Sequence, residues 1–323
     1  MKIGFTTSFP VEVVFAAGHI PIDMNNIFVT GNASSYVEKA EFEGYPRNIC
    51  SWIKGMYSVA LSANLDAVIG VVEGDCSNTH SLMSSLIDQG IEVFSFSFPH
   101  DKDRKKLKAE INKLERLFKV EHVQVLNVKH RLDKIRKKLV LLDKLTFEEN
   151  KVTGAENHQW LVNSSDFNSD PDDYEKRLDE FISEVKKRTP FVSKFRFGFL
   201  GVPPIITDLY DFLFEKNVNI VYNEIQRQFS MPSLKADLTD QYLEYTYPYS
   251  IIDRLHDIQV QIKKRQLNAV ISYSQSFCHR QIDNILIKKY LDIPVLTIEG
   301  DQPGKLDART KLRIESFLDM LRY

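Results

Sequence analysis

The sequence has 323 residues, of which 43% are hydrophobic and 27% are charged, a composition typical of a globular protein with material for two hydrophobic cores. Its formal net charge of −2 gives no electrostatic case for binding nucleic acid or an anionic membrane. No apolar run reaches the roughly 18 residues that a membrane span needs, and the first residues already have the pattern of a strand. We therefore expect a cytoplasmic protein.

The N-terminal part is predicted to form a strand at residues 3–7 and a helix at residues 8–18. Ser8 is the expected N-cap of this helix, and Pro10 would lie in its first turn. The turn between strand and helix contains the hydroxyl groups of Thr7 and Ser8 as well as free backbone N–H groups. These groups are suited to hold a carboxylate or a thioester oxygen, although a capped turn without a ligand has the same pattern.

The next helix is expected to begin near residue 46 and to carry Cys50 in its first turn, where the partial positive charge of a helix N-terminus favours a thiolate. Residues 101–145 are highly charged, with leucine and isoleucine at spacings of three and four, which predicts a pair of amphipathic helices. Residues 150–170 are rich in turn formers and are interpreted as a linker. A further helix is predicted at residues 171–187.

Two segments of the chain are similar to each other. Residues 65–76 and residues 267–278 are each a short apolar run of strand type that ends just before a cysteine, and they are separated by 202 positions (267 − 65 = 202). The strands predicted at residues 90–94 and 292–296 keep the same separation. A unit of strand, cysteine, helix and strand is therefore used twice, unless two ordinary βαβ units are alike by chance.

These elements predict an α/β protein with two Rossmann/flavodoxin-like domains, each with a parallel sheet, and a helical insert between them. We expect residues 1–100 to form the N-terminal α/β domain, residues 101–188 the helical insert and linker, and residues 189–323 the C-terminal α/β domain. The long excursion that ends near residue 248 is expected to line a site. No Gly-x-Gly-x-x-Gly or Walker loop is present, so a nucleotide site has no support.

The cysteines Cys50, Cys76 and Cys278 are too few and too far apart for a secreted disulfide scaffold. Three buried apolar cysteines are the ordinary interpretation. Their positions favour another one, because two of them follow equivalent strands, where open α/β sheets bind ligands, and the third starts a helix. The pattern indicates thiolates that bind a metal, without distinguishing iron from zinc.

Five segments together have the pattern of a known family: residues 7–21, the Gly-Asp-Cys turn at 74–76, residues 277–278, residues 293–301 and residues 309–317. Through them the chain resembles the 2-hydroxyglutaryl-CoA dehydratase D-component family, which includes 2-hydroxyacyl-CoA dehydratase subunits, related benzoyl-CoA reductase subunits and double-cubane cluster proteins. The resemblance extends over nearly the whole chain and implies that Cys50, Cys76 and Cys278 hold one 4Fe-4S cluster. A double-cubane protein would need more than three cysteines.

The resemblance also implies an activity of the lyase type, with a reductase-type activity as a variant. A separate ATP-dependent activase with its own iron-sulfur cluster would inject one electron, which the cluster passes to an acyl-CoA thioester, and the resulting ketyl radical would expel the neighbouring hydroxyl group. Cubane clusters usually have four thiolate ligands, so three leave one iron open. Such enzymes pair two related subunits, as a homodimer or a heterodimer. The alternative is a non-catalytic subunit that relays electrons or serves as a scaffold.

Further candidate residues are acid–base groups and substrate contacts, each of which has a structural hydrogen bond or a solvated surface position as its simpler explanation. Basic residues for the phosphates of CoA are candidates only because they are near the cysteines in sequence. The expected catalytic residues are Glu12, His80 and Glu299, with His279 as a further possibility. The expected substrate contacts are Thr7, Ser8 and Arg47, with Lys54 and Arg280 as further basic candidates.

Overall fold

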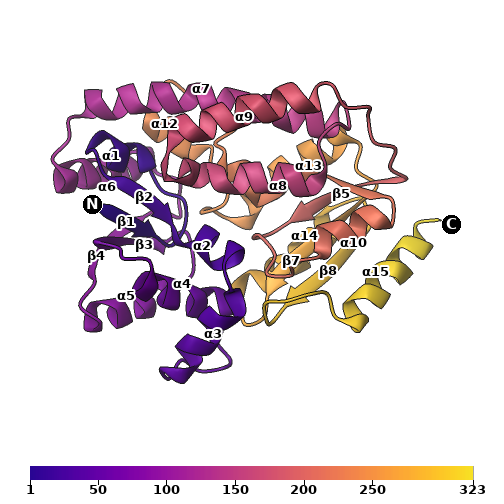
Figure 1. Ribbon diagram of the computed structural model, residues 1–323, viewed down its shortest axis with the longest axis horizontal. Coiled ribbons are helices and arrows are strands. Elements are labelled where there is room, and N and C mark those ends of the chain that lie inside the picture. The colour runs from indigo at the N-terminus through magenta and orange to yellow at the C-terminus, as the bar shows by residue number, and fades with distance from the viewer. Residues whose placement is uncertain (323) are drawn as a thin grey trace.

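The computed structural model describes residues 1–322 and contains two four-stranded sheets whose strands are all parallel (Figure 1). The first sheet has the strand order β2-β1-β3-β4, and the second has the equivalent order β6-β5-β7-β8. The predicted α/β class with two parallel sheets is therefore confirmed. The strands are β1 (Lys2–Phe5), β2 (Ile20–Asp23), β3 (Ala67–Glu73), β4 (Glu92–Ser97), β5 (Phe195–Leu200), β6 (Val218–Asn223), β7 (Ala269–Gln275) and β8 (Val295–Gly300).

The predicted internal repeat is present in the structure. Strands β3 and β7 occupy the same place in their sheets and begin 202 residues apart (269 − 67 = 202). Each lies between two parallel neighbours, β1 and β4 in the first sheet and β5 and β8 in the second. Because both faces of such a strand are covered, nearly all residues of β3 and every residue of β7 are buried or partly buried, which explains their continuous apolar runs.

The helices cover both sheets and form a layer that connects them. Those of the first half are α1 (Val11–Ala16), α2 (Met24–Thr30), α3 (Ala33–Phe42), α4 (Ser51–Ser62) and α5 (Thr79–Asp88). The central ones are α6 (Arg104–Phe118), α7 (His122–Phe147), α8 (Gly154–Val162) and α9 (Pro171–Val185). Those of the second half are α10 (Leu209–Glu215), α11 (Glu224–Phe229), α12 (Leu238–Leu243), α13 (Ile251–Arg265), α14 (Asp283–Tyr290) and α15 (Ala308–Met320).

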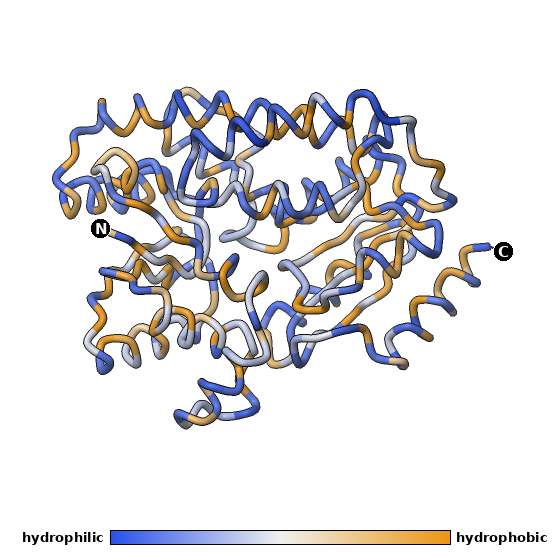
Figure 2. Tube along the Cα trace, viewed as in Figure 1, coloured by the Kyte–Doolittle hydropathy of each residue, from blue (hydrophilic) through white to orange (hydrophobic). Residues whose placement is uncertain are grey.

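The central helices bridge the two halves of the molecule. Helices α7, α8 and α9 run along the top of the view in Figure 1, and α7 contacts both α1 of the first half and β6 of the second. Figure 2 shows blue and orange alternating along these helices, as expected of amphipathic helices. In α6 the inward face is made by Leu107, Ile111 and Leu114, which are buried. The predicted pair of amphipathic helices at residues 101–145 is confirmed.

Two predicted helix starts and one predicted linker are wrong. Helix α1 begins at Val11 with Pro10 as its N-cap, so Ser8 lies before the helix and caps nothing. Helix α4 begins after Cys50, which is its N-cap residue and does not lie in the first turn. The predicted linker at residues 150–170 contains α8, which begins with a capping box in which the side chains of Thr153 and Glu156 satisfy each other's backbone N–H groups.

The excursion after β6 packs into the first half of the molecule. Its aromatic side chains belong to the same buried core as Phe5 and Phe98 of the N-terminal half, and Phe98 makes ring contacts with three of them. These residues are Tyr242, Tyr245 and Tyr249.

The division of the chain into domains at residues 100 and 188 stays a prediction. Within residues 1–322, no helix is long and apolar enough to cross a membrane.

Candidate functional site

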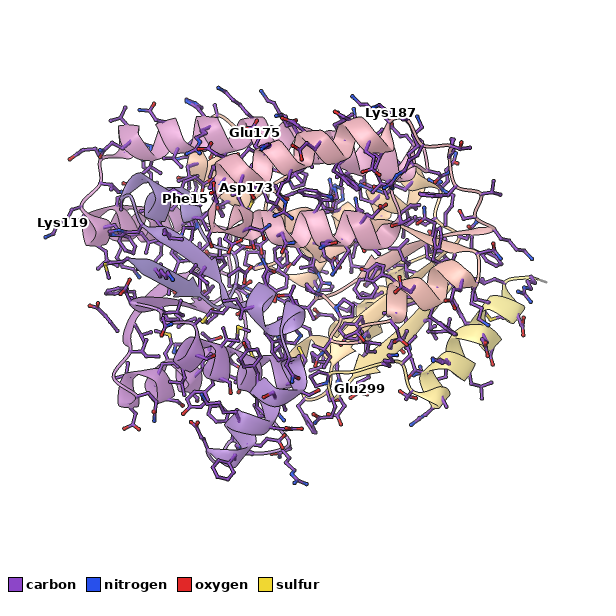
Figure 3. The ribbon with its side chains drawn as sticks, viewed as in Figure 1. Phe15, Lys119, Asp173, Glu175, Lys187 and Glu299 are labelled. Atoms are coloured by element: carbon purple, nitrogen blue, oxygen red, sulfur yellow. The ribbon has the colours of Figure 1, made fainter. Side chains whose placement is uncertain are left out.

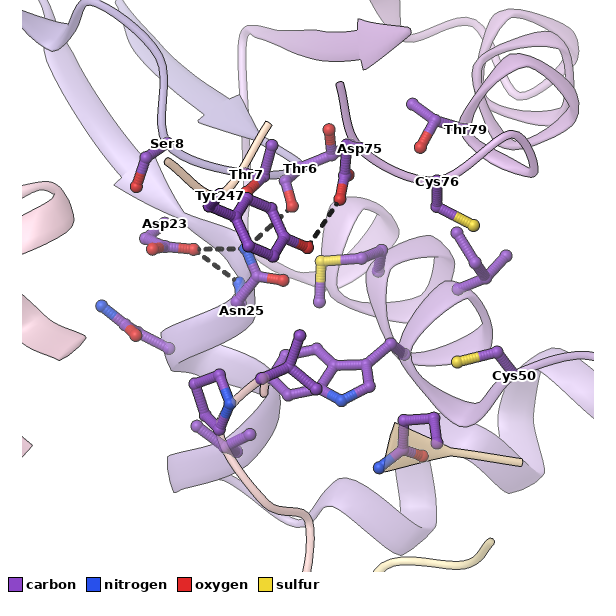
Figure 4. Close-up of a pocket in the computed structure, with 18 of the residues that line it drawn as sticks. Thr6, Thr7, Ser8, Asp23, Asn25, Cys50, Asp75, Cys76, Thr79 and Tyr247 are labelled. Carbon is purple, nitrogen blue, oxygen red and sulfur yellow. Dashed lines mark hydrogen bonds between the residues drawn. The ribbon is translucent and has the colours of Figure 1, made fainter. Parts of the chain in front are cut away.

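All three cysteines line one cavity of about 100 Å³, which we call the cysteine pocket. Figure 4 shows two of them, Cys50 and Cys76. The pocket lies at the carboxyl ends of strands from both sheets, because Thr7 follows β1, Cys76 follows β3 and Cys278 follows β7. Helices α2 and α4 form the rest of its first-half wall, and Tyr247 reaches it from the excursion. The pocket is therefore at the place where open α/β sheets bind ligands.

Near each of the three thiols, the backbone N–H of the residue two positions further along the chain lowers the pKa of the thiol. These N–H groups belong to Trp52 for Cys50, to Asn78 for Cys76 and to Arg280 for Cys278. At Cys50 the N–H group of Trp52 lies in the first turn of α4, where helix N–H groups have no partner within the helix. N–H groups that point at a sulfur atom favour its thiolate form and are the usual neighbours of metal-bound cysteines.

Burial acts against the thiolates while no cation is bound. It raises the pKa of Cys50 to about 12 and the pKa of Cys76 to about 11, and it raises the pKa of Cys278 as well. The charges of Cys76 and Cys278 also contribute to the raised pKa of Cys50, so ionisation of either of these thiols disfavours ionisation of Cys50. Binding a cation must therefore displace protons from the thiols, and it becomes easier as the pH rises.

The described side chains around the cysteine pocket are not arranged to hold a single metal ion. Within the described part of the chain, no three His, Cys, Asp or Glu side chains lie close enough together to hold one metal ion. A zinc site needs its ligands at about 2.0–2.3 Å from one atom, which brings the ligands into mutual contact. A cubane cluster is larger than one ion, so its thiolate ligands stand further apart. Three separated thiols around one cavity are suited to such a group.

Two of the cysteine turns are joined across the halves of the molecule. The Tyr247 hydroxyl donates to the Asp75 carboxylate at 3.0 Å (Figure 4), and Arg280 Nη2 donates to the Tyr247 carbonyl at 3.0 Å. The Arg280 guanidinium also lies over the Tyr247 ring, 4.5 Å from its centroid. Asp75 precedes Cys76 and Arg280 follows Cys278, so these contacts set the separation of the two turns. Burial raises the pKa of Asp75 to about 6 although Arg280 lowers it.

Gly74 makes the first of these turns possible. Its φ of 95° is in the region that favours glycine, and a Cβ atom there would lie 2.8 Å from Cβ of Pro248. A side chain at this position would push the excursion away from the turn that carries Cys76.

We missed Asp75 and Tyr247 in the sequence. The Gly-Asp-Cys turn was a signal for Asp75, whereas nothing in the sequence near Tyr247 indicated its role.

Several residues that line the cysteine pocket have a buried polar atom without a hydrogen-bond partner within the described residues. Buried polar groups in proteins are nearly always hydrogen-bonded, so such atoms beside one cavity are candidates for contact with a ligand. Thr7 and Ser8 line the pocket, and the Ser8 hydroxyl is one of these atoms. Their role as substrate contacts stays a prediction. The free atoms are Ser8 Oγ, Asn26 Oδ1, Trp52 Nε1, Thr79 Oγ1 and Gln275 Oε1.

The three predicted acid–base residues lie outside the lining of the cysteine pocket. Glu12 is fully buried, with its carboxylate 2.7 Å from Arg136. His80 is exposed on α5. Glu299 is exposed at the end of β8 (Figure 3), where its carboxylate accepts hydrogen bonds from the side chains of two residues near Cys278. Their catalytic roles stay predictions.

The predicted basic contacts are also outside the pocket lining. The Arg47 side chain is 92% exposed, which leaves it free to reach a ligand only at the surface. Lys54 is buried and its ammonium donates to Glu41 at 2.7 Å. Arg280 lines a small neighbouring cavity and is held by Tyr247, as described above. His279 is exposed, and its pKa is lowered, first by desolvation and then by the charge of Arg280.

A second cavity, of about 490 Å³, adjoins the cysteine pocket and shares Val29 and Val162 with it. The N-terminus of α3 and the side chains of His158 and Tyr210 form parts of its wall. Burial lowers the pKa of His158 to about 4, so this imidazole is neutral at neutral pH. Among the described residues, neither Lys nor Arg lines either of the two cavities, so this geometry offers the phosphates of CoA no side-chain cation there.

Comparison with known families gives one match over nearly the whole chain. Residues 6–321 match the sequence model of the family described as 2-hydroxyglutaryl-CoA dehydratase, D-component. No curated protein matches the chain.

Proposed function

Because the chain belongs to the 2-hydroxyglutaryl-CoA dehydratase D-component family, we propose that it is the iron-sulfur subunit of a 2-hydroxyacyl-CoA dehydratase-like enzyme. The family supports a subunit of dehydratase type, and the cluster and the radical chemistry are our proposal. The main observation in support of the cluster is that Cys50, Cys76 and Cys278, which are distant in sequence, line one cavity at the strand ends of both sheets. In this proposal the three thiolates hold a 4Fe-4S cluster.

A 4Fe-4S cluster with three protein thiolates would supply one-electron, ketyl-type activation of an acyl-CoA thioester, with one iron left open for a ligand. The chain's own contribution is to bind and shield the acyl group. Apolar side chains of the pocket wall, among them Ile53, Met56 and Phe229, exclude water from the reacting group. We propose that the hydroxyl groups of Thr7 and Ser8, two residues of the pocket lining, orient a thioester oxygen.

Proton transfer needs a group inside the pocket. Asp23 and Asp75 are the carboxyl groups among its described lining residues, which makes them better placed than Glu12, His80 or Glu299. Asp23 is the N-cap residue of α2, its carboxylate accepts from Ser165 and Asn25, and burial raises its pKa. We propose Asp23 as the group that exchanges a proton with the substrate. Its position at the end of β2 holds it in the wall of the pocket.

The proposed function requires partners. We propose an ATP-dependent activase with its own iron-sulfur cluster as the electron donor, and a related subunit or a second copy of the chain as the assembly partner. A non-catalytic electron-relay or scaffold subunit is the second candidate. It is favoured by the lack of Lys and Arg in the described lining of both cavities, because a relay subunit has no need to hold the phosphates of CoA.

Anaerobic purification followed by iron and sulfide analysis tests the cluster. We expect a brown protein with about four irons and about four sulfides per chain. The matched control is the same preparation exposed to air and a chelator, which should lose both the colour and the iron. A colourless protein that retains about one zinc per chain would show instead that the thiols hold a single ion.

A further inference from the structure

We propose that the acyl group handled in the cysteine pocket is electrically neutral, so that an acyl group with a distal carboxylate, as in 2-hydroxyglutaryl-CoA, is a poor ligand for this chain. The inference rests on the proposed function, because it assumes that the acyl group of a thioester occupies this pocket. It restricts the proposed function to thioesters whose acyl group carries no charge.

The charges around the pocket are the first reason. Its described lining contains no Lys, Arg or His residue, whereas it contains the carboxyl groups of Asp23 and Asp75 and the three cysteines. A carboxylate that enters this cavity loses its hydration and meets no positively charged side chain of the described lining, and burying a charge without a partner is strongly unfavourable.

The cations nearest to the wall are already paired with carboxylates or backbone groups. Arg280 donates to the Tyr247 carbonyl and lies 3.8 Å from Asp283. The ammonium of Lys54, on the far side of α4, is 2.7 Å from Glu41, and its side chain is 1% exposed. Turning either one toward the pocket would break a buried interaction. Neither Arg280 nor Lys54 is therefore free to pair with a second carboxylate in the pocket.

The second reason is that the residues lining the pocket have uncharged hydrogen-bonding groups. Its unpartnered polar atoms include two hydroxyl oxygens, one indole N–H and two amide oxygens. Ser8, Thr79 and Trp52 can donate hydrogen bonds, while Asn26 and Gln275 can accept them. These neutral groups match a hydroxyl, a carbonyl or a carboxamide of the acyl group.

A matched pair of thioesters tests the proposal. The first is 2-hydroxyglutaryl-CoA, and the second is its analogue in which the distal carboxylate is a carboxamide, so that the two differ in charge at one position and are alike in size. Their affinities for the anaerobic, cluster-loaded full chain are measured by calorimetry at pH 7.5, without turnover. We expect the carboxamide to bind at least about tenfold more tightly.

A variant that adds a positive charge to the pocket tests the same charge argument in the opposite direction. Val29 lies where the two cavities meet and is partly exposed, so a lysine there can reach the pocket while its stem stays on the wall. We expect Val29→Lys to reduce or reverse the preference for the carboxamide. Val29→Met has a similar length without the charge and should keep the wild-type preference. Melting temperatures of both variants establish that they are folded.

The outcomes separate the inference from the function on which it rests. Equal affinities, or tighter binding of the carboxylate to the wild type, overturn the neutral acyl group and leave the dehydratase proposal standing. Binding of neither thioester to a protein with a full iron content overturns both. A preference for the carboxamide that Val29→Lys leaves unchanged shows that charge is not its cause and also overturns the inference.

Discussion

Replacing Cys76 with serine is expected to lower the iron content of the anaerobically purified protein from about four to less than about one per chain. The hydroxyl of serine is a poor ligand for iron in such a cluster, where soft thiolates are preferred. With two thiolates left, the cluster is lost and any activity of the subunit disappears with it. Iron and sulfide analysis, together with the visible absorption spectrum, measures the effect.

Met56 provides the control for this experiment. Its side chain lines the same cavity and contains sulfur, but a thioether carries no negative charge. Met56→Leu keeps the volume of the wall and should retain the wild-type iron content. If Cys76→Ser retained as much iron as Met56→Leu, Cys76 would not be a ligand and the proposed cluster site would be wrong.

Replacing Arg136 with methionine is expected to destabilise the protein by about 3–5 kcal/mol in the free energy of unfolding. Arg136 and Glu12 are at most 2% exposed and form an ion pair of 2.7 Å, and Tyr242 donates to the other Glu12 oxygen at 2.9 Å. The variant leaves the Glu12 carboxylate in the core without its cation. Burial of an unpaired charge has a far larger effect than loss of a surface ion pair. Urea denaturation measures the change.

Lys138 lies on the same helix and makes a suitable comparison. It pairs with Glu175 and Asp179 of α9 at the surface, and its side chain is 30% exposed. We expect Lys138→Met to cost less than about 1 kcal/mol. A cost of Arg136→Met as small as that of Lys138→Met would contradict the structural role assigned to the buried pair.

The variant Glu12→Gln distinguishes two roles of Glu12. If Glu12 is a structural residue, the variant should be less stable than the wild type. If Glu12 is a catalytic base, the variant should keep its stability and lose activity. Because the Glu12 side chain points into the core beside α7 and the pocket lining does not include it, the structure favours the first result.

The strands and their cysteines could be predicted because their signals are local. The continuous apolar runs that became β3 and β7 are typical of strands covered on both faces, and parallel pairing then places the residues after them at one edge of each sheet. Helix α8 was missed because turn-forming residues dominate residues 150–170. The Thr153 and Glu156 capping box was a local signal that could have identified it.

Other features depend on contacts between distant residues, which no local pattern encodes. Glu12 and Arg136 are 124 positions apart (136 − 12 = 124), so no local pattern indicates that the carboxylate is paired and buried. The excursion after β6 packs into the core of the first half through its tyrosines, and Tyr247 thereby reaches Asp75. Its path is determined by tertiary packing, and for this reason the second wall of the pocket could not be predicted.

The central claim is that three cysteines hold one cluster whose remaining iron is open to a thioester. Mössbauer spectroscopy of the anaerobic protein, loaded with 57Fe and titrated with a 2-hydroxyacyl-CoA, tests it most directly. We predict two kinds of iron in a ratio of roughly three to one, with the signal of the single distinct iron changing when the thioester is added. Four equivalent irons that do not respond to any thioester would contradict the claim and favour an electron-relay subunit.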